Sequence, residues 1–156
     1  MIERIRAALE ELTVDRVYLA GEYASHAYIE SVANELRRHH YDVTSRWHTP
    51  GVVAWAAQNR AAGNVDRLGL AAKNMEDMDD ADGLVLFDAG ASTGKFVELG
   101  YTLCRSKPIV IMQYTQRRNL FCALADKTID VSGDEIERRR RLDAILASQV
   151  TGYVED

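Results

Sequence analysis

The chain has 156 residues, of which 47% are hydrophobic, and we expect it to form one domain over residues 1–156. Its net charge of -5 and its pI near 5.4 lack the concentrated positive surface that is typical of proteins binding nucleic-acid polymers. No stretch reaches the roughly 18 consecutive apolar residues of a membrane span, so the sequence predicts a soluble, cytoplasmic protein without a membrane partner.

The first third of the chain alternates helical and strand patterns. Apolar residues at helical spacing predict a short N-terminal helix at about 2–12. The continuous apolar run RVYLAG (16–21) predicts a strand, and the helical period returns over 25–39. The β-branched stretch YDVTSRW (41–47) predicts a second strand.

The middle of the chain begins with two helical segments. After Pro50, VVAWAAQNRAAG and then residues 65–80 predict helices separated by Gly63 and Asn64. GLVLFD (83–88) follows as the clearest buried strand of the sequence.

The last third continues the same alternation. A helix opens between Ser92 and Gly94 and runs to about Arg105, and strands are predicted over 108–114 and, more weakly, over 127–131. The arginines of DEIERRRRLDAIL are expected on a solvated helix face, opposite an apolar stripe that contains Ile136, Leu142, Ile145 and Leu146.

Strands that alternate with helices at these lengths indicate right-handed βαβ crossovers. The sequence therefore predicts an α/β fold: a doubly wound, Rossmann/flavodoxin-like parallel sheet of about five strands with helices on both faces. Ligands bind such sheets at the carboxyl ends of the strands. The candidate site residues are therefore those that follow each strand: Glu22, Tyr23, Arg46, Trp47, His48, Asp88 to Gly94, and Gln113 to Asn119.

Several of these candidates have two readings. Glu22 and Tyr23 can orient a ribose or serve the structure of the turn. Trp47 can stack on a base while Arg46 meets a charged group, or the indole can belong to the core. Asp88 can bind sugar hydroxyls or cap its loop.

Common nucleotide and metal motifs do not fit this sequence. The stretch DAGASTGKFVELGY contains Gly94 and Lys95 but has Ala89 where a P-loop needs glycine and Phe96 where it needs a hydroxyl. LAGEYAS lacks the glycine spacing of a dinucleotide fingerprint. The two cysteines, 104 and 122, lack metal-ligand spacing and are expected to be buried, reduced thiols.

Glu98 lies early in the helix that follows this loop. With Phe96, Leu99 and Leu103 toward the sheet, helical geometry places Glu98 on another side, near the positive helix N-terminus. That field favours the carboxylate, which can act as a nucleophile or stabilise an oxocarbenium-like transition state at a sugar. The alternative is an acidic residue that only complements the helix dipole.

Three stretches, VYLAG, NMEDMDDADGLVLFD and STGKFVELGYTLCRSKPIVIM, resemble the nucleoside 2-deoxyribosyltransferase family, which includes nucleotide N-hydrolases. The resemblance covers roughly residues 16–131 and implies the same doubly wound fold. It implies that Glu98 is the nucleophile and that Tyr18 corresponds to the tyrosine of the first strand. It also implies a homodimer or higher homo-oligomer, in which a polar residue such as Asn119 completes a neighbouring pocket; the apolar run VVAWAA (52–57) agrees with an interface.

The chain departs from the family pattern at two positions. Ser92 stands six residues before Glu98, where many members have an acidic residue and the nucleotide hydrolases tend to have serine; this favours a phosphorylated substrate. Asn74 stands where the family has a base-contacting aspartate, and an amide can hydrogen-bond a base but cannot protonate it. The usual general acid is therefore either absent or replaced by a neighbour such as Glu76 or Asp77.

These observations predict an enzyme that cleaves the N-glycosidic bond of a (deoxy)nucleoside or nucleoside 5′-monophosphate, by transfer to a second base or to water. Neither a metal nor an organic cofactor is predicted, because a carboxylate nucleophile and a heteroaromatic leaving group would need none. The alternative to this enzyme is a catalytically inactive domain that senses a nucleotide or nucleotide-sugar.

Overall fold

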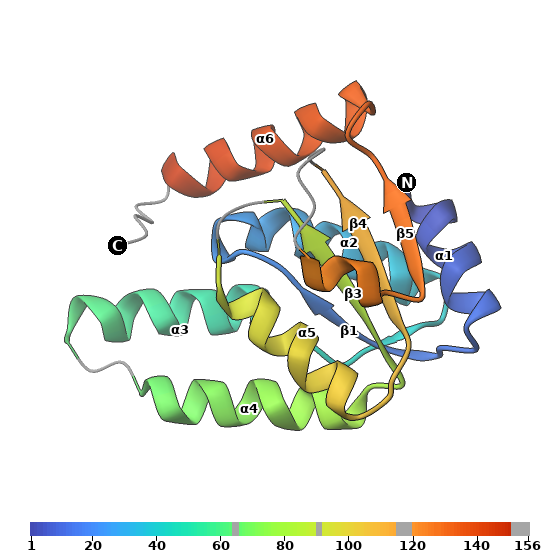
Figure 1. Cartoon of the computed structure of the whole chain (residues 1–156). Helices are drawn as coiled ribbons and strands as arrows, with labels where there is room; N and C mark the ends of the chain where they lie inside the picture. The colour runs from blue at the N-terminus through green and yellow to red at the C-terminus, as the bar shows by residue number, and fades with distance from the viewer. Residues whose placement is uncertain (64–65, 90–91, 115–119, 151–156) are drawn as a thin grey trace.

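The computed structural model describes residues 1–63, 66–89, 92–114 and 120–150 (Figure 1). In chain order its elements are α1 (Ile2–Glu11), β1 (Arg16–Ala20), the 3₁₀ helix η1 (Tyr23–Ser25), α2 (His26–Arg38), β2 (Asp42–Val43), α3 (Pro50–Ala61), α4 (Arg67–Asp80), β3 (Gly83–Asp88), α5 (Gly94–Cys104), β4 (Ile109–Gln113), the 3₁₀ helix η2 (Leu120–Leu124), β5 (Lys127–Asp130) and α6 (Glu135–Val150). No helix within these ranges is both long and apolar enough to cross a membrane.

The strands form one parallel sheet in the order β2-β1-β3-β4-β5. The predicted α/β fold with a five-stranded parallel sheet is thereby confirmed. Chain order reverses between β1 and β3, and doubly wound sheets bind their ligands at such a switch point, beyond the carboxyl ends of the strands.

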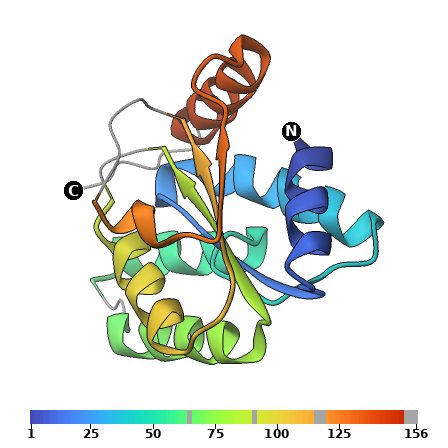
Figure 2. The ribbon, with the colours of Figure 1, turned by 45° about the vertical axis from the view of Figure 1, so that its right-hand side comes forward.

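Helices cover both faces of the sheet (Figures 1 and 2). α1 and α2 lie on one face, α4 and α5 lie on the other, and α6 packs against α2 and η1. α3 and α4 form a hairpin that extends beyond the edge of the sheet in Figure 1.

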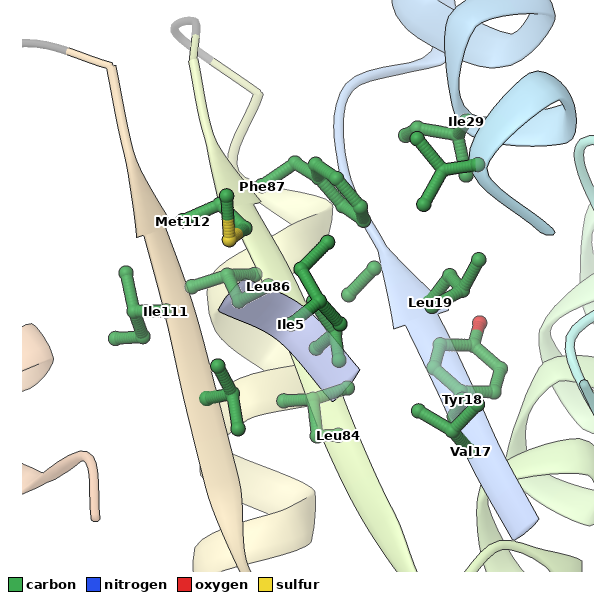
Figure 3. Packing of buried hydrophobic residues seen from close by; sticks show 14 of the residues in the cluster. Ile5, Val17, Tyr18, Leu19, Ile29, Leu84, Leu86, Phe87, Ile111 and Met112 are labelled. Atoms are coloured by element: carbon green, nitrogen blue, oxygen red, sulfur yellow. The ribbon is translucent and has the colours of Figure 1, made fainter. Parts of the chain in front are cut away.

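The central strands are apolar throughout because both of their faces are covered. All six residues of β3 and all five of β4 are buried. Figure 3 shows Ile5 of α1 lying over the sheet beside Leu86, and all the residues labelled in that view belong to one buried cluster.

The second strand is much shorter than the sequence predicted. β2 contains only Asp42 and Val43, and the predicted strand over 41–47 is wrong beyond that point. Ladder-type pairing with β1 ends when the amide of Thr44 donates to the carbonyl oxygen of Val17. From Ser45 onward, side chains instead of backbone groups bond to β1, so the strand is not needed there.

Two surface expectations are also corrected. Arg138, Arg139 and Arg140 are exposed as expected, but Arg141 is only 15% exposed because it turns inward to Glu22. Of the predicted apolar stripe, Ile136 is 82% exposed, and Leu142 and Leu146 are exposed as well. Cys104 is exposed, because it lies at the end of α5 past the buried face, while Cys122 is buried as expected.

Candidate active site

A pocket of about 190 Å³ lies at the switch point of the sheet, between the end of β1, the start of α5 and the α3–α4 hairpin. Its lining combines an apolar wall with a small number of polar groups, as is usual for small-molecule sites. The residues that line it are Gly21, Tyr23, Trp47, Val52, Ala56, Leu70, Asn74, Ser92, Gly94, Lys95 and Glu98.

Glu98 and Tyr18 are hydrogen-bonded at the inner side of this pocket. α5 begins at Gly94, so Glu98 lies in its second turn, where the side chain reaches β1. The hydroxyl of Tyr18 donates to Glu98 Oε1 at 2.8 Å, and Tyr18 itself is 1% exposed. The neutral phenol thus orients the carboxyl group while the rest of the carboxyl remains at the pocket.

Protonation of Glu98 differs from the expectation based on the helix N-terminus. Burial raises the pKa of Glu98 to about 7, and the hydrogen bond from Tyr18 opposes that rise only in part. The helix N-terminus is expected to favour the carboxylate, whereas burial acts in the opposite direction and favours the neutral acid. Burial, followed by the charge of Glu98, also raises the pKa of Tyr18, which therefore stays a hydrogen-bond donor.

The predicted orientation of α5 is also corrected. The buried residues of the helix are Lys95, Leu99 and Thr102, while Phe96 is only half-buried at the margin of the core. The sheet-facing side is therefore rotated toward Glu98, which explains its contact with β1.

Asp88 and Lys95 form a second, charged pair beside the pocket. Lys95 Nζ lies 3.0 Å from Asp88 Oδ1, and the two side chains are 0% and 11% exposed. Lys95 lines the pocket, whereas Asp88, at the end of β3, lies outside the lining as the structure describes it. The carboxylate is thus engaged by a buried ammonium group.

Arg46 is turned toward Asp77 and lies outside the described pocket lining. Its Nη2 and Nε atoms lie 2.6 and 2.8 Å from Asp77 Oδ1, and its backbone N–H donates to Asp77 Oδ2 at 3.1 Å. Asp77 is 5% exposed and holds the segment after β2 through these bonds, while Glu76 is exposed on α4. Neither Glu76 nor Asp77 is among the described pocket-lining residues, so neither is placed to supply the acid that Asn74 lacks.

The remaining sequence candidates divide into two groups. Tyr23, Trp47, Asn74, Ser92 and Gly94 all line the pocket, and the rings of the first two lie 6.3 Å apart between centroids. Glu22 instead accepts hydrogen bonds from Arg141 and Ser25. Asn119 lies outside the described residues.

Sequence reasoning missed two parts of the site. Val52, Ala56 and Leu70 form the apolar wall, and the run VVAWAA (52–57) was the available signal for the first two. Arg141 joins the turn after β1 to the carbonyl oxygen of Ala89, but nothing in a run of four arginines distinguishes the one that turns inward.

No group of three or more His, Cys, Asp or Glu residues within the described ranges is arranged to hold a metal ion. The polar groups of the pocket are a carboxyl group, hydroxyls, an amide and an ammonium, which suit a hydroxylated, heterocyclic ligand.

A protein-family model matches most of the chain. Residues 17–146 match the family model described as nucleoside 2-deoxyribosyltransferase. The match extends from β1 into α6 and so contains Tyr18, Asn74, Ser92 and Glu98. No curated protein matches the chain.

Proposed function

Since the chain belongs to the nucleoside 2-deoxyribosyltransferase family, we propose that it cleaves the N-glycosidic bond of a (deoxy)nucleoside or nucleoside 5′-monophosphate. The observation that carries this proposal is the Tyr18–Glu98 hydrogen bond at the switch-point pocket. A carboxyl group with a pKa of about 7 is ionised in roughly half of the molecules at neutral pH and is poorly solvated, which suits a nucleophile.

In the proposed reaction, the Glu98 carboxylate attacks the anomeric carbon of the sugar. A carbon–oxygen bond forms, the carbon–nitrogen bond breaks, and the base leaves with the electron pair and acquires a proton. A second base or water then attacks the same carbon, gives its proton to solvent and releases the carboxylate. Tyr18 stays protonated throughout and keeps the attacking oxygen oriented.

The base is proposed to lie between Trp47 and the apolar wall, with the amide of Asn74 at one of its edges. An amide donates or accepts a hydrogen bond but does not supply a proton. The departing base therefore takes its proton from solvent or is itself a good leaving group.

The 5′ group is proposed to lie near Ser92 and the first amides of α5. Thr93, not Ser92, is the N-cap of α5, so the Ser92 hydroxyl at the pocket is not used as the helix cap. A neutral hydroxyl at a positive helix end accepts a phosphate without repulsion. Ser92→Asp should therefore raise KM for a deoxynucleoside monophosphate more than for the matching nucleoside, and an equal effect on both would contradict this placement.

We also propose a homodimer or higher homo-oligomer. Large apolar side chains are exposed on the three helices around the pocket: Trp55, Leu68, Met75 and Val97. Burial of such side chains at a symmetric interface is favourable. Light scattering at micromolar concentration should show at least a dimer, and a fully active monomer would contradict the proposal.

The alternative function is a domain that binds a nucleotide or nucleotide-sugar without cleaving it. Asn74 favours this alternative, because it lacks the acid that would assist the departure of the base. Incubation with each deoxynucleoside and its monophosphate, followed by chromatography for free base, separates the two functions. Base release that is lost in Glu98→Ala supports the enzyme; binding of the same compounds without release by the unaltered protein supports the sensor.

A further inference from the structure

A buried network of hydrogen bonds lies behind the pocket, in the segment that follows β2. Glu30 Oε2 lies 2.7 Å from His48 Nδ1, and His48 Nε2 lies 2.9 Å from Ser45 Oγ. Ser45 and His48 are 0% and 1% exposed, and all three residues lie outside the pocket lining described above. The proposed reaction gives this Glu30–His48–Ser45 network no role.

The order of groups is that of a nucleophilic triad, but the surroundings exclude that chemistry. Ser45 Oγ accepts the backbone N–H of Leu19 at 3.1 Å and is closed off from solvent. A nucleophilic serine needs an open approach for its substrate and a lone pair that is free to attack. The network leads to the backbone of β1 instead.

At Leu19 the network meets Trp47, which lines the pocket. The N–H of Leu19 donates to Ser45 Oγ, and its carbonyl oxygen accepts from Trp47 Nε1 at 2.8 Å. In a parallel sheet both groups would be bonded by the neighbouring strand, but β2 ends at Val43. The side chains of Ser45 and Trp47 therefore replace the missing strand, and one residue of β1 connects the network to the indole.

A neutral His48 satisfies every member of the network at once. Its Nδ1–H donates to the Glu30 carboxylate and its Nε2 accepts the Ser45 hydroxyl, so a lone pair of Ser45 Oγ remains for Leu19. Burial lowers the pKa of His48 in agreement with this form. The imidazole and the indole of Trp47 also pack in a T-shaped arrangement, with ring centroids 5.3 Å apart and planes at 84°.

We propose that Glu30, His48 and Ser45 are positioning residues that hold the indole of Trp47 in place as the stacking surface of the pocket. That the stacked group is a nucleobase rests on the proposed function, whereas the positioning itself does not. Because the indole of Trp47 would contact the substrate both before and during the reaction, loss of the network should weaken substrate binding more than it slows the chemical step.

The test compares Ser45→Ala with Thr49→Ala in a Trp55→Phe background, where Trp47 is the one remaining tryptophan. Thr49 is a matched control because its hydroxyl lies in the same segment but donates to the carbonyl oxygen of Arg46. Ser45→Ala should increase acrylamide quenching of Trp47 fluorescence about twofold and raise KM for a deoxynucleoside monophosphate about tenfold, with kcat changed by less than about threefold. Thr49→Ala should change none of these.

A conservative replacement extends the test. His48→Ala should increase both the quenching and KM. His48→Gln, which keeps a polar group toward Ser45, should show smaller increases in both. Glu30→Gln changes the half-buried outer end of the network. If Ser45→Ala does not unfold cooperatively, Glu30→Gln replaces it in the comparison with Thr49→Ala.

Equal quenching and equal KM in Ser45→Ala and Thr49→Ala would overturn the proposal. If the unaltered protein releases no base from any substrate, the proposed function fails, and the quenching comparison still decides the positioning of Trp47.

Discussion

Two carboxyl groups lie at the first turns of α5, and one has a charged partner while the other has a neutral one. Asp88, at the end of β3, faces the buried ammonium group of Lys95 at 3.0 Å. Glu98 receives a hydrogen bond from the uncharged phenol of Tyr18, and burial raises its pKa to about 7. A charged partner stabilises the ionised form of the first carboxyl group, whereas the neutral partner of the second offsets the cost of its ionisation only in part.

The largest expected effect concerns Glu98 itself. Glu98→Gln keeps the size of the side chain and its contact with Tyr18 but removes the nucleophile, so kcat for base release should fall by on the order of 10³-fold or more. Glu10→Gln, an exposed change on α1, is the control and should retain full activity. Residual activity within about tenfold of the unaltered protein would show that Glu98 is not the nucleophile.

Removal of the charged pair between Asp88 and Lys95 should lower the stability of the protein. Asp88→Asn leaves the buried Lys95 ammonium without its carboxylate, so the free energy of unfolding should fall by about 3 kcal/mol, as measured by denaturant titration. Asp79→Asn affects a pair with Arg105 in which both side chains are about half exposed, and should have a much smaller effect. Equal losses in the two variants would show that burial of the Asp88–Lys95 pair is not what distinguishes it.

Stability should also depend on pH through Glu98. A folded-state pKa of about 7, against roughly 4.3 in the unfolded chain, means that the folded protein holds the proton more tightly, so this contribution to stability is full below about pH 4.3 and is lost as pH rises from there to about 7. Glu98→Gln lacks that loss. The variant should therefore gain roughly 3 kcal/mol over the unaltered protein between pH 4 and pH 8, measured as the difference in free energies of unfolding. A constant difference across this range would contradict the raised pKa.

The smallest expected effect is a shift of a pH profile. The hydrogen bond from Tyr18 favours ionised Glu98, so its removal in Tyr18→Phe should raise the pKa of Glu98 further. The acidic limb of kcat/KM should then move to higher pH, while in the control Tyr41→Phe it should stay in place. An unmoved limb in Tyr18→Phe would mean that another group controls ionisation at the site.

The sequence alone determined the alternation of elements and hence the sheet. Continuous apolar runs such as residues 83–88 predicted strands covered on both faces, and the structure confirms a five-stranded parallel sheet. The loop that leads into Glu98 also carried the family resemblance, which the family match confirms. These features are local, because each depends on residues that are close together in the chain.

The tertiary structure decided which side chains are solvated and which partners they meet. The burial that raises the pKa of Glu98 could not be predicted from its own helix, and its hydrogen-bond partner, Tyr18 of β1, lies 80 residues earlier in the sequence. The early end of β2 depends on two side chains that bond to Leu19, and periodicity carries no information about such bonds. Desolvation and hydrogen bonding act over a few ångströms in space, so residues far apart in the chain set them, and only the folded chain brings those residues together.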